Sequence, residues 1–280
     1  MKYYRQEANN LLIMPLELDW EYEFRRISIF LKNLLKESGA KGVVIGLSGG
    51  LDSSVVATLL AKSLGSDNVL GLIMPTRFTP YEDIKDAKYV AEMLRLKTIE
   101  VSIDEIVSSF IRSTGLKEED HKMAVANLRA RVRMCILYMY ANSYNYLVAG
   151  TSDKSEYILG YFTKYGDGAS DFTVITHLYK SQVRRFAKWL GLPEHIAEKP
   201  SAPRLYPGHT ALDELPADYS VLDQIMYALF DLRMSARDVI EKLGYPKTLV
   251  DDVIRRYYMN KHKRRIPPMP VEVILQDPLE

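Results

Sequence analysis

Residues 46–54 read Gly-Leu-Ser-Gly-Gly-Leu-Asp-Ser-Ser, a run that combines anion-binding groups with one carboxylate. Gly49 and Gly50 allow a ligand to approach the backbone because glycine has no Cβ. The helix expected to follow presents free N–H groups and the positive end of its dipole, which both favour phosphate. Asp52 would repel a bare triphosphate, but a magnesium ion binds carboxylate and phosphate oxygens together. The run therefore predicts a magnesium-nucleotide site; the alternative is that Asp52 is only a favourable first-turn residue.

The same run differs from two better-known phosphate-binding patterns. It has no lysine, so it is not G-x-x-x-x-G-K-[ST], and its glycine spacing is not G-x-G-x-x-G. It follows the apolar residues 42–45, which are typical of a buried strand. A second polar stretch, residues 150–153, follows another predicted strand. Thr151 in that stretch could hydrogen-bond adenine or ribose, or could simply cap a helix.

Two basic stretches supply candidate partners for anionic groups. Arg129 and Arg133 are four residues apart and share one face of a predicted helix, while Arg131 points elsewhere. Arginines on a helix are most often solvated or ion-paired, although a guanidinium also suits paired bonds to phosphate or carboxylate. The basic run 261–265 could be a nuclear or nucleic-acid-binding tag. Because the rest of the chain is balanced in charge, we prefer a structured tail that reaches a substrate phosphate.

Alternating strands and helices must position these groups. Asp19 is the expected N-cap of a first helix that ends at Ser38-Gly39. The predicted strands are 42–47, 69–74, 97–103 and 145–150. The helices expected between them are 53–64, 82–95 and 118–142. Beyond residue 172 the sequence is mostly helical, with segments near 179–190, 222–230, 235–243 and 247–259.

Strands that alternate with helices of about ten or more residues indicate βαβ units. We therefore expect an α/β fold in which a doubly wound parallel sheet is covered by helices on both faces, with a helical C-terminal part. Ligands of such sheets bind beyond the carboxyl ends of the strands, and the runs 46–54 and 150–153 both lie there. No repeat or low-complexity linker divides the sequence. We expect one domain over residues 19–280, preceded by an N-terminal extension of residues 1–18.

The composition limits the classes of protein to which the chain could belong. It has 280 residues, 47% of them hydrophobic, which is enough for a sizeable core. The 37 Lys and Arg residues balance 36 Asp and Glu residues, so nothing in the charge calls for nucleic acid or an acidic membrane as partner. The single cysteine, Cys135, excludes an intrachain disulfide and a zinc ribbon, and we expect it in the core. With no apolar signal segment and no run able to span a bilayer, a cytoplasmic protein is expected.

The order Ser-Gly-Gly-x-Asp-Ser after a strand resembles the pyrophosphatase loop of the N-type ATP pyrophosphatases, which cleave ATP between the α and β phosphates. Within that superfamily, the block Gly-Tyr-Phe-Thr-Lys-Tyr-Gly-Asp-Gly at residues 160–168 is similar to one in the NAD synthetases. Three further blocks agree: residues 127–134, residues 150–156 and residues 262–268. The resemblance covers about residues 20–270 in order. It implies an adenine nucleotide alpha hydrolase-like, Rossmann-like fold and the ATP-dependent amidation of deamido-NAD to NAD by ammonia, through an adenylated intermediate.

The resemblance also implies roles for individual residues. ATP would be contacted by the whole loop and by three later residues: Gly46, Leu47, Ser48, Gly49, Gly50, Leu51, Asp52, Ser53, Thr151, Lys180 and Ser201. Asp52 and Glu156 would hold Mg²⁺, although Glu156 by itself would more often be a surface residue. Asp52 and Lys180 would be catalytic, because charge grows on the α-phosphoryl oxygens. The residues implied for deamido-NAD are Arg131, Lys164, Asp171, His262 and Lys263. In the family this second site forms at a dimer interface, so a homodimer is expected.

One segment departs from the family pattern. Where an acidic pair and a glycine are usual, residues 206–216 carry Ala211, Leu212 and Pro216, and Asp213 and Glu214 are a shifted substitute. This loop normally closes over the reacting groups. Its departure bears on the rate, on ammonia handling and on loop closure more than on the fold.

Two other functions fit the superfamily motif. A tRNA-modifying enzyme would need a basic RNA-binding face and often cysteines for sulfur transfer, which one Cys and a net charge of +1 argue against. A nucleotide-binding sensor would bind ATP without releasing pyrophosphate, if the segment 206–216 no longer closed. The chain leaves no room for an added glutaminase domain beside the synthetase, so we expect free ammonia, or ammonia delivered by another protein, as nitrogen donor.

Overall fold

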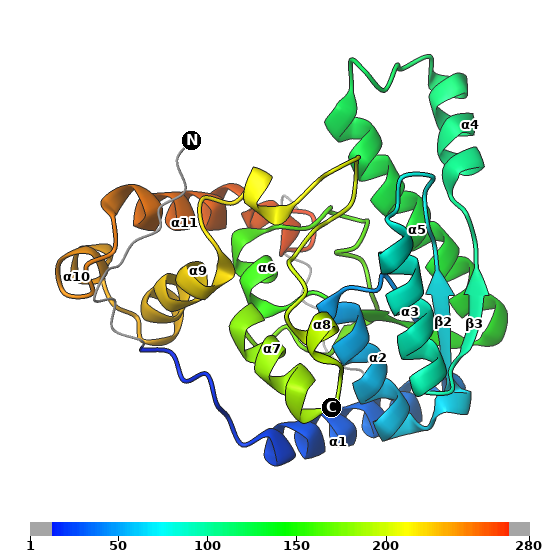
Figure 1. Ribbon diagram of the computed structural model, residues 1–280, viewed down its shortest axis with the longest axis horizontal. Coiled ribbons are helices and arrows are strands. Elements are labelled where there is room, and N and C mark those ends of the chain that lie inside the picture. Colours follow the sequence, from blue (N-terminus) through cyan, green and yellow to red (C-terminus); the bar gives the residue numbers. More distant parts are fainter. Residues whose placement is uncertain (1–12, 269–280) are drawn as a thin grey trace.

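The computed structural model describes residues 13–268, and its fold is built on a five-stranded parallel sheet. The strands are β1 Gly42–Gly46, β2 Val69–Ile73, β3 Lys97–Glu100, β4 Tyr146–Gly150 and β5 Phe172–Thr173. Two of the strands, β2 and β3, are labelled at the right of Figure 1. The order of the five strands is β3-β2-β1-β4-β5, and every neighbouring pair is parallel. Because the order runs outward from β1 in two directions, the predicted doubly wound α/β fold is confirmed.

Two layers of helices cover the sheet. One layer contains α1 Trp20–Ser38, α2 Leu51–Leu64, α3 Tyr81–Met93 and α7 Lys180–Trp189; the other contains α4 Asp104–Thr114 and α5 Lys122–Tyr144. Along β1, Val43 and Ile45 join the core of the first layer and Val44 joins the core of the second. Since both faces are covered, β1 and β2 are buried along almost their whole length, which explains their continuous apolar sequences.

The C-terminal part builds a second, helical core beside the sheet, at the left of Figure 1. Its elements are α6 Lys154–Leu159, α9 Tyr219–Met226, the π-helical turn Tyr227–Asp231, α10 Ala236–Glu241 and α11 Lys247–Met259. The short helix α8 Glu194–Ala197 packs instead in the core of the first helical layer, through Ile196 and Ala197. The end of the N-terminal extension joins this core, because the Gln224 side chain accepts from the backbone N–H groups of Ile13 and Met14 at 3.0 and 2.9 Å. The rest of the predicted extension, residues 1–12, lies outside the described residues.

The predicted elements agree with the structure in type, but some elements were not predicted. Asp19 caps α1 as expected, and its Oδ1 accepts from Tyr22 N–H at 2.9 Å. The helices α4, α6 and α8 and the strand β5 are additional. The predicted strand 97–103 ends at Glu100, since the chain turns there toward α4. Within residues 13–268, no helix combines the length and the apolar composition needed to cross a membrane.

The prediction that Cys135 lies in the core is wrong, because its side chain is exposed. The α5 helix buries Val132 and Ile136 against the sheet. Residues 131, 135 and 139, spaced by four, consequently lie on the outward face. The phase of the helix therefore overrides the general tendency of free cysteine to be buried.

The strand order reverses between β1 and β4, so the loops that follow these two strands meet at one edge of the sheet. Residues 47–50 follow β1 and lead into α2, and residues 151–153 follow β4 and lead into α6. Residues of both loops line one cavity. The fold thus brings together the two polar stretches that the sequence placed at strand ends.

Candidate active site

The loop after β1 leads into a helix that has no side-chain cap. Gly50 is the N-cap of α2, so the first N–H groups of the helix keep their donors available. Ser48 and Ser53 lie beside this helix end, with their hydroxyl oxygens 3.0 Å apart. The loop therefore presents hydroxyl groups and backbone donors at the positive end of a helix dipole, an arrangement suited to phosphate.

Lys199, which was not predicted as a site residue, fixes this loop to α3. Gly49 has φ +72°, and a Cβ placed on it would lie 2.0 Å from the backbone oxygen of Asp83. The Lys199 ammonium donates to the Gly49 carbonyl at 2.9 Å and contacts Asp83 Oδ1 at 2.8 Å and Asp86 Oδ2 at 2.6 Å. The contacts join residues far apart in the chain, so no local sequence signal could have indicated them.

A fully buried lysine lies between three carboxylates at the edge of the cavity. The Lys180 Nζ is 2.6 Å from Asp52 Oδ2, 2.9 Å from Glu156 Oε1 and 3.0 Å from Asp153 Oδ2. Lys180, Asp52 and Glu156 were all predicted from the sequence, and the structure brings them together. Asp153 was not predicted; it caps α6 by accepting from Glu156 N–H at 2.8 Å. The pattern Asp-x-x-Glu before a helix is a local signal that could have found it.

Burial and the balance of charge shift the pKa values in this cluster. Burial opposes the charged form of Lys180, but Asp153, Asp52 and Glu156 outweigh it and hold the pKa of the ammonium well above its ordinary value. Burial raises the pKa of Glu156 to about 7, against the attraction of Lys180. Burial also raises the pKa of Asp153. One ammonium group among three carboxyl groups leaves the cluster short of positive charge, so a second cation would stabilise it.

One oxygen of Asp52 is suited to such a cation. Asp52 Oδ1 is buried and accepts no hydrogen bond from the described part of the chain, whereas Oδ2 contacts Lys180. A buried polar atom without a partner costs free energy. Mg²⁺ binds one or two carboxylates together with phosphate oxygens, so Asp52 and Glu156 fit this ion. Over residues 13–268, the side chains of His, Cys, Asp and Glu form no group of three or more that could hold a metal ion by itself.

A buried carboxylate from the C-terminal part holds the segments that carry Glu156 and Lys180. Asp223 of α9 accepts from the Ser155 hydroxyl at 2.6 Å and from the N–H and hydroxyl of Ser181 at 2.8 and 2.7 Å. The Ser155 hydroxyl in turn accepts from Lys180 N–H at 2.9 Å. Burial raises the pKa of Asp223 to about 6, although its serine donors oppose that shift. The network connects α6 and α7 to α9, and it was not predicted from the sequence.

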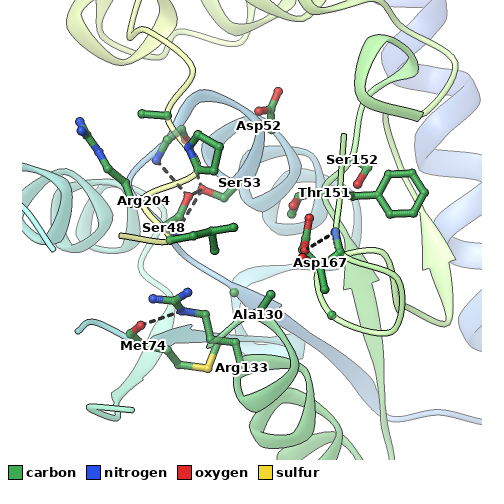
Figure 2. Close-up of a pocket in the computed structure, with 18 of the residues that line it drawn as sticks. Ser48, Asp52, Ser53, Met74, Ala130, Arg133, Thr151, Ser152, Asp167 and Arg204 are labelled. Carbon is green, nitrogen blue, oxygen red and sulfur yellow. Dashed lines mark hydrogen bonds between the residues drawn. The ribbon is translucent and has the colours of Figure 1, made fainter. Parts of the chain in front are cut away.

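The loop after β1 and the carboxylates of Asp52 and Glu156 border one cavity of about 470 Å³, a volume typical of small-molecule sites (Figure 2). The predicted site residues that line it are Gly46, Leu47, Ser48, Gly50, Leu51, Asp52, Ser53, Thr151, Glu156, Ser201 and Lys263. Gly49 and Lys180 do not themselves line the cavity, but they contact residues that do. Asp167 lines the cavity as well and had no predicted role; its Oδ1 accepts from Thr163 N–H at 3.0 Å.

The segment that departs from the family pattern covers one side of the cavity. His209 and Glu214 both line it, with His209 Nε2 2.8 Å from Glu214 Oε1. Burial lowers the pKa of His209, while Glu214 opposes this shift. Asp213 instead accepts from Thr210 N–H at 2.7 Å. Of the two acids considered as substitutes for the missing pair, only Glu214 therefore reaches the cavity.

Most residues predicted to bind the dinucleotide lie outside this cavity. Arg131 is exposed and donates to the Lys164 carbonyl at 3.2 and 3.3 Å. Asp171 accepts from Tyr138 Oη at 3.1 Å, and His262 is exposed. Lys263 differs, because it lines the cavity and donates to the backbone oxygens of residues 160 and 162 at 2.7 and 2.8 Å. The structure therefore separates the predicted ATP residues from most of the predicted dinucleotide residues.

Comparisons with known proteins identify relatives along almost the whole chain. The sequence model of the family described as NAD synthase matches residues 23–267. The NH(3)-dependent NAD(+) synthetase of Hyperthermus butylicus is 49% identical over 256 residues, which cover 91% of this chain and 92% of that protein. The solved NMN synthetase of Francisella tularensis has a TM-score of 0.79 at 30% identity and covers 91% of this chain and 99% of its own. The NH3-dependent NAD synthetase of Campylobacter jejuni has a TM-score of 0.77 at 32% identity, with 90% and 99% covered.

Proposed function

The chain belongs to the NAD synthase family, and on this basis we propose that it converts deamido-NAD to NAD with ATP and ammonia and releases AMP and pyrophosphate. The observation that carries the proposal is the buried ammonium of Lys180, which Asp52 and Glu156 hold beside a phosphate-binding loop. An enzyme that cleaves a triphosphate needs such a fixed cation next to the bond that breaks.

The reaction has two steps, and the described cluster acts in the first. An oxygen of the nicotinate carboxylate attacks the α-phosphorus of ATP, the bond from this phosphorus to the bridging oxygen breaks, and pyrophosphate leaves. Negative charge grows on the phosphoryl oxygens, and Lys180 and the N–H groups at the start of α2 stabilise it. Ammonia then attacks the acyl carbon, AMP leaves, and the nitrogen gives up a proton. The carboxylate needs adenylation because it is otherwise a poor acyl donor.

Asp52 and Glu156 are the residues that would hold Mg²⁺, which would neutralise charge on the departing phosphates. Asp52 Oδ1, which has no hydrogen-bond partner among residues 13–268, and the excess of carboxyl groups around Lys180 support this assignment. Lys180 contacts both of these carboxylates, so the position of its ammonium group and the binding of Mg²⁺ would depend on each other.

Deamido-NAD would bind partly beyond the ATP cavity, on the surface that carries Arg131, Lys164, Asp171 and His262. Lys263 links the two regions, because it lines the cavity and belongs to the same predicted set. We propose that a second copy of the chain completes this surface, as a homodimer. An exposed face of α5, which includes Cys135, supports that arrangement. A cytoplasmic location is part of the same proposal.

A mononucleotide product is the second candidate, because one similar solved structure is an NMN synthetase. The dinucleotide is preferred, since the relative that is 49% identical is an NAD(+) synthetase. The two functions differ only in what the amidated ring is attached to. The same assay therefore distinguishes them when both deamidated substrates are offered in parallel.

The test mixes the purified chain with ATP, Mg²⁺, deamido-NAD and an ammonium salt, and follows NAD and AMP. Equal amounts of NAD and AMP from ammonium, with little product from glutamine, are expected. AMP without NAD would place the defect in the amination step and point to residues 206–216. Tight ATP binding without either product would favour a sensor and contradict the proposal.

Asp52→Asn tests the role of the carboxylate in the first step. The change keeps the shape of the side chain but removes its charge, so formation of AMP is expected to fall by roughly 100-fold or more. Asp67→Asn is the control, since Asp67 is an exposed acid outside the cavity. Wild-type turnover in Asp52→Asn would contradict the assignment of a metal-binding role to this residue.

A further inference from the structure

The three arginines of α5 have three different environments in the structure. Arg129 is buried and contacts Glu118 Oε1 at 2.6 Å and the Leu205 carbonyl at 3.0 Å. Arg131 is exposed, on the outward face of the helix. Arg133 lines the cavity, one turn of the helix beyond Arg129. Of these three arginines, Arg133 is the one that lines the cavity, and it has no role assigned so far.

The hydrogen bonds of Arg133 are incomplete. Its Nε donates to the Met74 carbonyl at 3.0 Å, and within residues 13–268 the two Nη groups have no partner. These Nη atoms are not among the fully buried unpaired atoms, so they are open to the cavity. Figure 2 shows the guanidinium next to Met74 and on the side of Ser48. Burial lowers its pKa to about 10, so the group keeps its charge at neutral pH.

The wall around Arg133 is apolar. Leu72 lies in β2, Met74 directly follows this strand, and Met134 and Leu137 come from α5. A Cβ placed on Gly46 would lie 3.5 Å from Met74 Cε and 3.8 Å from Leu137 Cδ1, so these side chains border the end of β1. Phosphate groups would lose hydration against such a wall, whereas a flat heterocycle would gain contact. The polar loop 48–53 offers the phosphates a better position.

From this division of the cavity, we infer that Arg133 recognises the adenine base of ATP, with the free edge of its guanidinium bonding a ring nitrogen or its face stacking on the ring. The inference rests on the proposed use of ATP. A guanidinium is planar, donates hydrogen bonds in a fixed direction and stacks well on aromatic rings. The triphosphate then extends from the β2–α5 wall to the N-terminus of α2. In this orientation Arg133 determines nucleotide specificity and takes no part in the chemistry.

Direct binding measurements with ATP, AMP and inorganic pyrophosphate test this assignment. Arg133→Met keeps the length and apolar character of the side chain but removes the guanidinium. The variant is expected to bind ATP and AMP about tenfold more weakly, while its affinity for pyrophosphate stays unchanged. Arg112→Met, at an exposed position of α4, is the matched control and should bind all three as the wild type does. Arg131→Met should bind deamido-NAD more weakly and should bind AMP as tightly as the wild type does.

Two results would overturn the inference. If pyrophosphate binding falls as much as AMP binding, the guanidinium contacts phosphate and not the base. If neither ATP nor AMP weakens, Arg133 has no part in nucleotide recognition. If Arg133→Met fails to fold, the loss of AMP affinity is compared with the loss of pyrophosphate affinity in Arg133→Lys. That variant keeps the positive charge but has no planar guanidinium. These binding measurements need no turnover. A failure to form NAD would therefore contradict the proposed function, but it would not affect the conclusion about adenine recognition by Arg133.

Discussion

At the scale of single residues, the phosphate-binding loop depends on a backbone contact that only glycine allows. Gly49 lies against the Asp83 carbonyl of α3, and Lys199 holds the same junction by bonding the Gly49 carbonyl and both nearby carboxylates. The loop is therefore fixed on one side before any ligand binds. Such preorganisation matters because small displacements of a positioning group cost much of the rate.

Replacement of Gly49 by alanine is expected to damage nucleotide binding far more than stability alone would explain. The added Cβ would lie 2.0 Å from a backbone oxygen, so the loop has to move. We expect KM for ATP to rise by on the order of 100-fold, measured by steady-state kinetics. Gly39→Ala is the control, since Gly39 has φ +67° and nothing within 4 Å. It should lose about 1 kcal/mol of stability from backbone strain and keep its KM. Equal kinetic effects in both variants would contradict the clash.

At the scale of elements, the site depends on how α6 and α7 are held by α9. Asp223 bonds Ser155 and Ser181, which are the direct chain neighbours of Glu156 and Lys180. A single buried carboxylate of the helical core therefore sets the spacing of two active-site segments. Because this carboxylate is fully buried, its ionisation opposes folding unless its three donors compensate.

This arrangement predicts a pH dependence of stability that belongs to Asp223. Its pKa is about 6 in the folded chain and ordinarily 3.8, so the protonated form stabilises the fold. This contribution is complete below pH 3.8 and is lost as the pH rises through 6. The gap corresponds to about 3 kcal/mol. In chemical unfolding, the stability of the wild type minus that of Asp223→Asn should fall by about this amount from pH 4 to 7. A difference that stays flat would show that Asp223 does not titrate in this range.

Whether a feature could be predicted from the sequence depended on how local its signal was. The loop 46–54 is contiguous, and the alternation of strands and helices is regular, so the site's position at the sheet edge followed from both. Lys199 and Asp223 act through partners distant in the chain, and no motif indicates such contacts. Cys135 was misplaced because α5 carries apolar residues on several sides, and its sequence pattern does not define which face is buried. The helix α4, which follows the short edge strand β3, was not predicted.

At the scale of the whole molecule, one chain does not bring all the predicted substrate residues to one cavity. Most residues proposed for ATP line the cavity, while Arg131 and Asp171 are exposed, Arg131 on the outward face of α5 and Asp171 bonded to Tyr138 of the same helix. That face also exposes Cys135 and Met139, whose exposed fraction is 71%. Met and Arg are both enriched in protein–protein interfaces, and this face exposes one of each, Met139 and Arg131. The second subunit would then bury this face and complete the dinucleotide site.

This arrangement predicts that a charge on the outward face of α5 separates the subunits and weakens one substrate only. Met139→Glu places a carboxylate in the proposed interface, where burial without a partner is costly. Light scattering after gel filtration should show a dimer for the wild type and a monomer for the variant. KM for deamido-NAD should rise by about tenfold or more, while ATP binding remains unchanged, because the ATP cavity lies within one chain. Tyr81→Glu, a change at an exposed aromatic residue of α3, is the matched control for added charge.

The single cysteine provides an independent readout of the same interface. Cys135 lies one helical turn before Met139 on α5, so a dimer should protect it from a thiol reagent. We expect slow labelling in the wild type and in Tyr81→Glu, and fast labelling in Met139→Glu. Bound deamido-NAD should slow the labelling of the wild type further, because the substrate and the partner subunit stabilise each other through linked binding. A wild-type chain that is monomeric at concentrations giving full activity, with Cys135 freely labelled, would mean that one subunit forms the complete dinucleotide site.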